Sequence, residues 1–372
     1  MKLRSDRAHW LIVLLFISAT FSSCKDQQRK TEVKEPLPSS ISTEELIFRL
    51  ERRIWVIHQD TKGNYWFGSN GNGITWYDGS ELKFITTKDG LNDNTIRGIQ
   101  EDHLGNIFIE TPGGVSKYDG KEFTTLEPIV PESNQWQLAS DDLWFNCNGN
   151  ADDVYRYDGE NLYQLQLPRQ DLEGDLGLNI SGLSYSPYTV FGIDKDKQGN
   201  IWFGTVIAGA YRYDGESFLW VGEKELSRLP DGREPGVRSM LEDNDGYIWL
   251  SNFMSKYKIN DEGPIEYEKS PAVPLPSKPL DDIAYFNSGL IDVNGDLWMT
   301  EYGGDVWKYD GDQLVNFPVK NGEMDILLIS IYEDREGTLW LGTDNDGAYR
   351  YNGESFEKFI PALLPQLNPV DQ

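Results

Sequence analysis

Carboxylate pairs are the residues of this chain that best suit acid and base chemistry. Asp152 and Asp153 are neighbours, and Glu301 and Asp344 occupy matching loops of a unit that repeats along the chain. One protonated and one ionised carboxyl group can supply the acid and the base for cleaving a sugar polymer. A lyase or glycosidase acting on an extracellular polysaccharide is therefore one alternative for the function.

The sequence gives little support for a metal site or for other kinds of catalysis. After the first 23 residues the chain has two histidines, His58 and His103, whereas a zinc site needs three or four close nitrogen or sulfur ligands. No G-x-S-x-G motif marks a nucleophilic serine. The stretch "DNDG" makes Asp344 and Asp346 weak candidates for calcium, because it lies in a loop that can meet other loops. We expect no catalytic residue and no other cofactor.

The chain is strongly acidic, with a formal net charge of −27 over 372 residues. Such a surface repels phosphate backbones and anionic lipid head groups, so we expect no nucleic acid partner. The two cysteines are Cys24 and Cys147. Because the N-terminal pattern indicates a lipid on Cys24, no internal disulfide is available, and we expect Cys147 to be a small buried residue.

The N-terminus has the features of a secretion signal. A basic start precedes the apolar run "LIVLLFISATF", which is short for a membrane span, and "FSSC" follows. This order resembles the lipobox of bacterial lipoproteins, which implies removal of residues 1–23 and acylation of Cys24. The stretch "CKDQQ" is similar to surface-export signals of Bacteroidetes lipoproteins. We expect an outer-membrane lipoprotein that touches the membrane only through its anchor, on either the periplasmic or the outer face.

Residues 24–41 are polar and contain proline, which is typical of a flexible tether. The segment Ser42–Leu50 fits either a short capped helix or a strand that helps to close a ring. We assign residues 42–361 to one repeat domain and residues 362–372 to a C-terminal tail.

One unit recurs seven times between these bounds. Its core is a D-x-x-G-[ND] turn, an aromatic strand of the W-F-G-T kind, a glycine-bearing loop and a "YRYDG" strand that ends in a tight turn. The central aromatic of each copy is Trp66, Phe108, Trp144, Trp202, Trp249, Trp298 or Trp340. Each copy predicts four short strands, A to D, and the repeated aromatics predict packing between neighbouring sheets. The sequence therefore predicts an all-β fold, a single seven-bladed β-propeller of four-stranded blades.

The stretch "FITTKDGLNDNTIRGIQEDHLGNIFIETPGGVSKYDG" resembles the two-component regulator propeller repeat. In that family the repeat fills the periplasmic sensor region of hybrid sensor kinases. No kinase segment follows Gln372, so we expect a stand-alone lipoprotein form without kinase activity. The fold also resembles propeller lyases related to virginiamycin B lyase, which use a histidine base, but this chain has few histidines.

Binding is expected on the face that carries the B–C and D–A loops, because these loops vary in length and sequence while the turns of the other face repeat. The candidate ligand-binding residues on that face are Trp136, Asp152, Asp153, Tyr188, Phe253, Glu301, Tyr302, Asp344 and Asp346. We expect a non-catalytic, monomeric recognition module for a polysaccharide fragment, a peptide or a partner protein. A lyase or glycosidase, or a scaffold lipoprotein of an envelope complex, would also fit the sequence.

Overall fold

The computed structural model describes residues 53–133, 136–147, 152–228, 232–272 and 285–361. The chain divides into two compact units, Met1–Ile41 and Ser42–Gln372, and all described residues belong to the second. The secretion signal, Cys24, the tether, the Ser42–Leu50 segment and the C-terminal tail lie outside the described residues. Within the described residues, no helix has the length and apolar character needed to cross a membrane.

The described residues form antiparallel sheets whose strands pair in chain order. The first sheet unit contains β1 (Ile54–Gln59), β2 (Tyr65–Ser69), β3 (Ile74–Tyr77) and β4 (Leu82–Ile85), and the second contains β5 (Gly98–Glu101), β6 (Ile107–Thr111), β7 (Gly114–Tyr118) and β8 (Phe123–Thr125). The third contains β9 (Leu143–Phe145), β10 (Asp153–Tyr157) and β11 (Leu162–Gln166), and the fourth contains β12 (Val190–Lys195), β13 (Ile201–Thr205), β14 (Ala210–Tyr213) and β15 (Phe218–Val221).

The remaining sheet units follow the same order. The fifth contains β16 (Met240–Glu242), β17 (Tyr247–Leu250), β18 (Ser255–Asn260) and β19 (Glu266–Pro271), and the sixth contains β20 (Ser288–Ile291), β21 (Leu297–Glu301), β22 (Asp305–Tyr309) and β23 (Leu314–Pro318). The seventh contains β26 (Leu328–Glu333), β27 (Leu339–Thr343), β28 (Ala348–Tyr351) and β29 (Phe356–Lys358). The connections carry the hairpin β24 (Lys320–Asn321) with β25 (Met324–Asp325), and the short helices η1 (Thr87–Asp89), α2 (Leu172–Leu176) and α3 (Lys224–Ser227).

The third sheet unit departs from the predicted four strands. Its described part has three, because the segment before β9 forms no strand beside it. Trp136 lies in that segment, and its ring stacks on Trp144 with a centroid distance of 5.8 Å. The ring also contacts Phe203, Tyr213 and Phe218, so it packs between the third and fourth sheet units.

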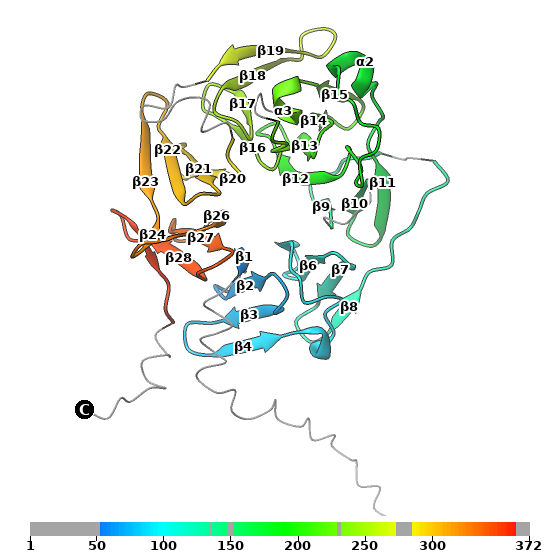
Figure 1. The fold of residues 1–372 in the computed structure, drawn as a ribbon. Helices are drawn as coiled ribbons and strands as arrows, with labels where there is room; N and C mark the ends of the chain where they lie inside the picture. The colour runs from blue at the N-terminus through cyan, green and yellow to red at the C-terminus, as the bar shows by residue number, and fades with distance from the viewer. Residues whose placement is uncertain (1–52, 134–135, 148–151, 229–231, 273–284, 362–372) are drawn as a thin grey trace, which may run out of the picture. The chain divides into compact units, whose positions relative to one another are not determined.

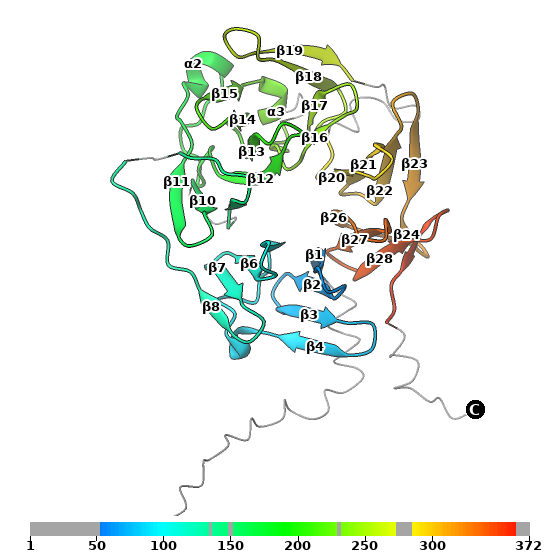
Figure 2. The same cartoon turned by 180° about the vertical axis from the view of Figure 1, so that it is seen from behind.

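The sheets are set around a common centre, with strands such as β1, β12, β16, β20 and β26 innermost (Figures 1 and 2). The first unit lies beside the seventh, since Ile54 of β1 pairs with Thr343 of β27 and joins their strands into one eight-stranded sheet. Apolar clusters of buried side chains link the first unit to the second and each later unit to the next. A further cluster, which includes Phe67 and Trp340, links the seventh unit back to the first.

In five units a turn aspartate accepts a hydrogen bond from the indole N–H of the tryptophan six residues later. The pairs and their oxygen–nitrogen distances are Asp60–Trp66 (2.9 Å), Asp196–Trp202 (3.1 Å), Asp243–Trp249 (3.0 Å), Asp292–Trp298 (2.9 Å) and Asp334–Trp340 (2.7 Å). The other oxygen of Asp334 accepts the backbone N–H groups of Glu336 and Thr338, which closes the tight turn. One carboxylate thus fixes both the turn and the direction of the ring.

We expect Asp334→Ala to cost about 3 kcal/mol or more of unfolding free energy. Asp334 accepts hydrogen bonds from its own turn, from the indole of Trp340 and, at 2.8 Å, from the hydroxyl of Tyr65 in the first unit. Its removal therefore leaves buried donors of both units without an acceptor. Denaturant unfolding measures the loss.

The matched control is Asp310→Ala, which removes an exposed turn carboxylate that accepts only the N–H groups of Asp312 and Gln313 in its own turn. We expect a much smaller loss there, because water can replace the lost acceptor. Equal losses for the two variants would contradict the role given to the turn aspartate.

Candidate functional site

A central cavity of about 650 Å³ opens where the inner strands begin, on the face of the B–C and D–A loops. Its lining residues are Trp55, Val56, Ile57, Arg97, Phe191, Arg238, Tyr285, Asn287, Ser288, Tyr302, Ile329, Ser330, Ile331 and Tyr332. Among the described residues that line it, none is an aspartate or a glutamate, although the chain has 61 acidic residues.

The cavity wall is built from one repeated backbone position. Six residues stand five positions before the turn aspartate or its equivalent, and all six line the central cavity: Trp55, Arg97, Phe191, Arg238, Asn287 and Ile329. The pairing register shifts at this position in the first, fourth and seventh units, as between Ile54 and Val56. A β-bulge inserts one residue and redirects its side chain. In these three units the bulge directs Trp55, Phe191 and Ile329 toward the centre, whereas Arg97, Arg238 and Asn287 reach the cavity from just before their strands β5, β16 and β20.

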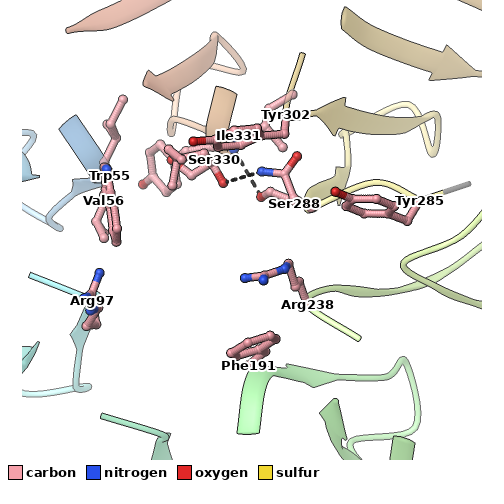
Figure 3. A pocket seen from close by; sticks show the side chains of 14 residues that line it. Trp55, Val56, Arg97, Phe191, Arg238, Tyr285, Ser288, Tyr302, Ser330 and Ile331 are labelled. Atoms are coloured by element: carbon pink, nitrogen blue, oxygen red, sulfur yellow. Dashed lines mark hydrogen bonds between the residues drawn. The ribbon is translucent and has the colours of Figure 1, made fainter. Parts of the chain in front are cut away.

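The two arginines of this set point into the open centre from different sheet units (Figure 3). The guanidinium of Arg97 lies 4.5 Å from the centroid of the Trp55 ring, and that of Arg238 lies 4.0 Å from the centroid of Phe191. Nε of Arg238 also donates to the carbonyl of Pro235 at 3.1 Å. A cation–π contact orients a guanidinium without neutralising it, so both groups keep their positive charge and their outer N–H donors.

Arg97 has few polar partners. Nε and Nη1 of Arg97 are buried without a hydrogen-bond partner among the described residues. Loss of hydration lowers the pKa of Arg97 and of Arg238, but an arginine in a protein remains protonated at neutral pH. The cavity is therefore a positively charged site in an acidic protein.

A smaller cavity of about 310 Å³ shares Arg97 and Arg238 and adds two carboxyl groups, Glu110 and Asp194. Burial raises the pKa of Glu110 to about 7, although the backbone N–H groups of Asn146 and Cys147 donate to it. Burial also raises the pKa of Asp194 to about 6, against one hydrogen bond from the N–H of Met240. Both groups therefore change charge close to neutral pH.

These two arginines and these two carboxyl groups were not among the residues predicted from the sequence. A signal was present: Glu110 occupies the strand position held by Gly68, Gly204 and Gly342 in other units. Its side chain lies against Gly98, where an added Cβ would be 2.5 Å from Oε2 of Glu110. A charged residue at a position that elsewhere carries glycine marks a local departure from the scaffold.

Among the aromatic candidates, Tyr302 lines the central cavity, whereas Trp136, Tyr188 and Phe253 do not. Trp136 packs on Trp144 and Phe218, and Phe253 is 1% exposed and packs against Phe286. Tyr188 is buried, and its hydroxyl donates to the carbonyl of Gln170 at 2.8 Å. The structure gives these three rings a packing role, so Tyr302 is the one aromatic candidate that a ligand in the cavity could touch.

Each carboxylate candidate already accepts a hydrogen bond from another side chain. The pairs are Asp152 with Arg169, Asp153 with Gln166, Glu301 with the indole of Trp307, Asp344 with the indole of Trp55, and Asp346 with Lys358 and Asn321. A cation at Asp344 and Asp346 would compete with these N–H donors. No group of three or more potential metal ligands occurs in the described part of the chain.

The remaining candidate groups lie apart from the central cavity. Cys147 is buried and unpaired, and burial raises the pKa of its thiol. Burial lowers the pKa of His58, whose Nε2 lies 4.0 Å from Glu101. His103 lies in the exposed turn between β5 and β6, on the opposite face. The histidines therefore provide no general base in the central cavity.

Comparisons with known proteins identify the repeat. The family model of the two-component regulator propeller matches residues 323–345, so this chain carries that repeat. A curated relative, histidine kinase P4 of Formosa agariphila, is 23% identical in an alignment of 312 residues that covers 75% of this chain and 21% of the relative. The chain thus spans about a fifth of that protein's length.

Solved structures share the fold. The streptogramin B lyase structure superposes with a TM-score of 0.57 at 16% identity, covering 80% of this chain and 93% of the lyase. The extracellular domain of the hybrid two-component system BT4673 of B. thetaiotaomicron superposes with a TM-score of 0.54 at 21% identity, covering 82% of this chain and 38% of that domain. At these identities the likeness shows the fold alone.

We expect Glu110→Gln to alter how stability depends on pH. The raised pKa means that folded Glu110 binds its proton more tightly than unfolded Glu110, so its contribution to stability is present below about pH 4.5 and is lost as pH rises to about 7. The glutamine keeps an oxygen for the N–H groups of Asn146 and Cys147 but does not titrate. The variant should therefore gain about 3 kcal/mol relative to the wild type across this window.

Denaturant unfolding at pH 4.5 and pH 8 measures this difference. Asp141→Asn, at an exposed carboxylate, is the matched control and should change little between the two pH values. A constant difference between Glu110→Gln and the wild type would show that Glu110 titrates as it does in the unfolded chain.

Proposed function

We propose that this chain, which carries a two-component regulator propeller repeat, is a non-catalytic recognition propeller of the cell envelope. It binds a polysaccharide fragment, a peptide or a partner protein on the B–C/D–A face, in the manner of a sensor region. A lipidated Cys24 anchors it at the outer membrane. The observation that carries this proposal is the central cavity, whose lining differs from unit to unit while the surrounding turns repeat.

The seven-bladed propeller is part of the same proposal. Seven apolar clusters link successive sheet units, and the last of them connects the seventh unit to the first. Tyr65 and Asp334 add a hydrogen bond to that last interface. This pattern supports seven blades that surround the central cavity.

The lyase or glycosidase function receives less support than recognition. The carboxylates suggested for it, such as Asp153 and Asp344, are engaged by Gln166 and by the indole of Trp55. The two carboxyl groups with raised pKa, Glu110 and Asp194, adjoin the cavity, but their backbone donors hold them in the wall. We therefore place binding rather than turnover at this site.

We expect the full chain, solubilised in detergent, to unfold at a higher temperature in the presence of a member of an oligosaccharide and peptide panel. A ligand at a hundredfold its Kd stabilises the folded state by about 2.7 kcal/mol. Tyr302→Ala should abolish the shift, because Tyr302 is 44% exposed and lines the cavity.

Leu104→Ala is the control for that experiment. Leu104 is 72% exposed in the turn between β5 and β6, on the opposite face, so the variant should keep the full shift. A shift that survives in Tyr302→Ala would move the site away from the central cavity. The absence of any shift across the panel would argue against a receptor for small ligands and favour a scaffold lipoprotein.

A further inference from the structure

We propose that the central cavity binds an acidic oligosaccharide, with carboxylate or sulfate groups of the sugar bound by Arg97 and by Arg238. This inference rests on the proposed recognition function and names its ligand class. It is carried by the placement of two guanidinium groups in a cavity whose described lining has no acidic residue.

The charge balance of the cavity favours an anion. The chain carries a net charge of −27, yet neither arginine has a carboxylate within ion-pair distance among the described residues. Asp93 and Glu110 are near enough to Arg97 to favour its charge, but Glu110 has a pKa of about 7 and is partly neutral at physiological pH. An unpaired charge within a cavity costs free energy, and a bound anion would offset that cost.

The geometry of the arginines suits a group with several oxygens. Arg97 and Arg238 come from the second and fifth units and project into one space, each with a ring face behind it. The planar fork of a guanidinium donates two parallel hydrogen bonds to a carboxylate or a sulfate. Each fork can bind an anionic group of the sugar on its own side of the cavity.

The rest of the lining suits a sugar ring rather than a protein surface. A volume of about 650 Å³ lies in the range of small-ligand sites. Tyr285 and Tyr302 offer ring faces on which the C–H face of a sugar can pack, and each ring ends in a hydroxyl group.

Calorimetric titration of the full chain in detergent tests this inference. The probes are a uronic-acid disaccharide, a sulfated disaccharide, a neutral disaccharide of the same linkage and a glutamate-rich tetrapeptide. We expect one acidic disaccharide to bind at least tenfold more tightly than the neutral one, with an affinity that falls as salt is added. The carboxylate and sulfate probes show which anionic group the site prefers.

Arg97→Gln and Arg238→Gln should each weaken binding of the acidic disaccharide at least tenfold. Arg238→Lys keeps the charge but not the fork, so it should lose less, and it serves as the second test if a glutamine variant does not fold. Arg335→Gln is the matched control, because Arg335 is exposed in a turn of the opposite face and should bind like the wild type.

The outcomes separate this inference from the function on which it rests. Equal binding of neutral and acidic disaccharides, with both abolished by Tyr302→Ala, would overturn the acidic ligand and keep the recognition site. Binding of the acidic peptide alone would overturn the carbohydrate class. Acidic binding that both glutamine variants retain would overturn the arginine site, and no binding by any probe would overturn both proposals.

Discussion

The hydrogen bond from an indole N–H to a turn aspartate is the constraint on which the rest of the structure depends. The aspartate closes the turn between the first two strands of a unit, and its second oxygen fixes a tryptophan that packs toward the next sheet. A sheet of four short strands cannot bury both of its faces by itself. The repeated pair therefore couples local turn formation to packing between sheets, and Asp334 extends this coupling to Tyr65 of the first unit.

Departures from this pair occur in the second and third units. The second has Phe108 in place of tryptophan, and the turn carboxylate of Asp102 accepts the side-chain amide of Asn106 at 2.7 Å. In the third, Nε1 of Trp144 has no partner among the described residues, and Asp142 binds Arg156 instead. Glu110 lies at the interface of these two units and lines the smaller cavity, so the scaffold departs from its repeat beside that cavity.

The candidate site is formed by a repeated backbone position of the sheet units. The position five residues before the turn aspartate lines the central cavity in six units, and its side chain differs among most of them. Two arginines there make a positive cavity, and Glu110 and Asp194 adjust its charge. Because both carboxyl groups have raised pKa values, the cavity becomes more positive as pH falls from about 7 to below 6.

The sequence by itself determined the repeating scaffold. Each copy contains the same local features: the turn aspartate, the aromatic six residues later and the strand spacing. The all-β fold, the interfacial tryptophans and the short turns could therefore be predicted from the sequence. The tertiary structure determines which residues form the candidate site. Arg97 and Arg238 are 141 residues apart and precede strands β5 and β16 of different sheet units, so only the folded arrangement of these units brings them to one cavity. The structure also leaves Tyr302 exposed and buries Tyr188 and Phe253. The sequence could not distinguish them, because the exposure of a loop aromatic depends on which distant segments cover it.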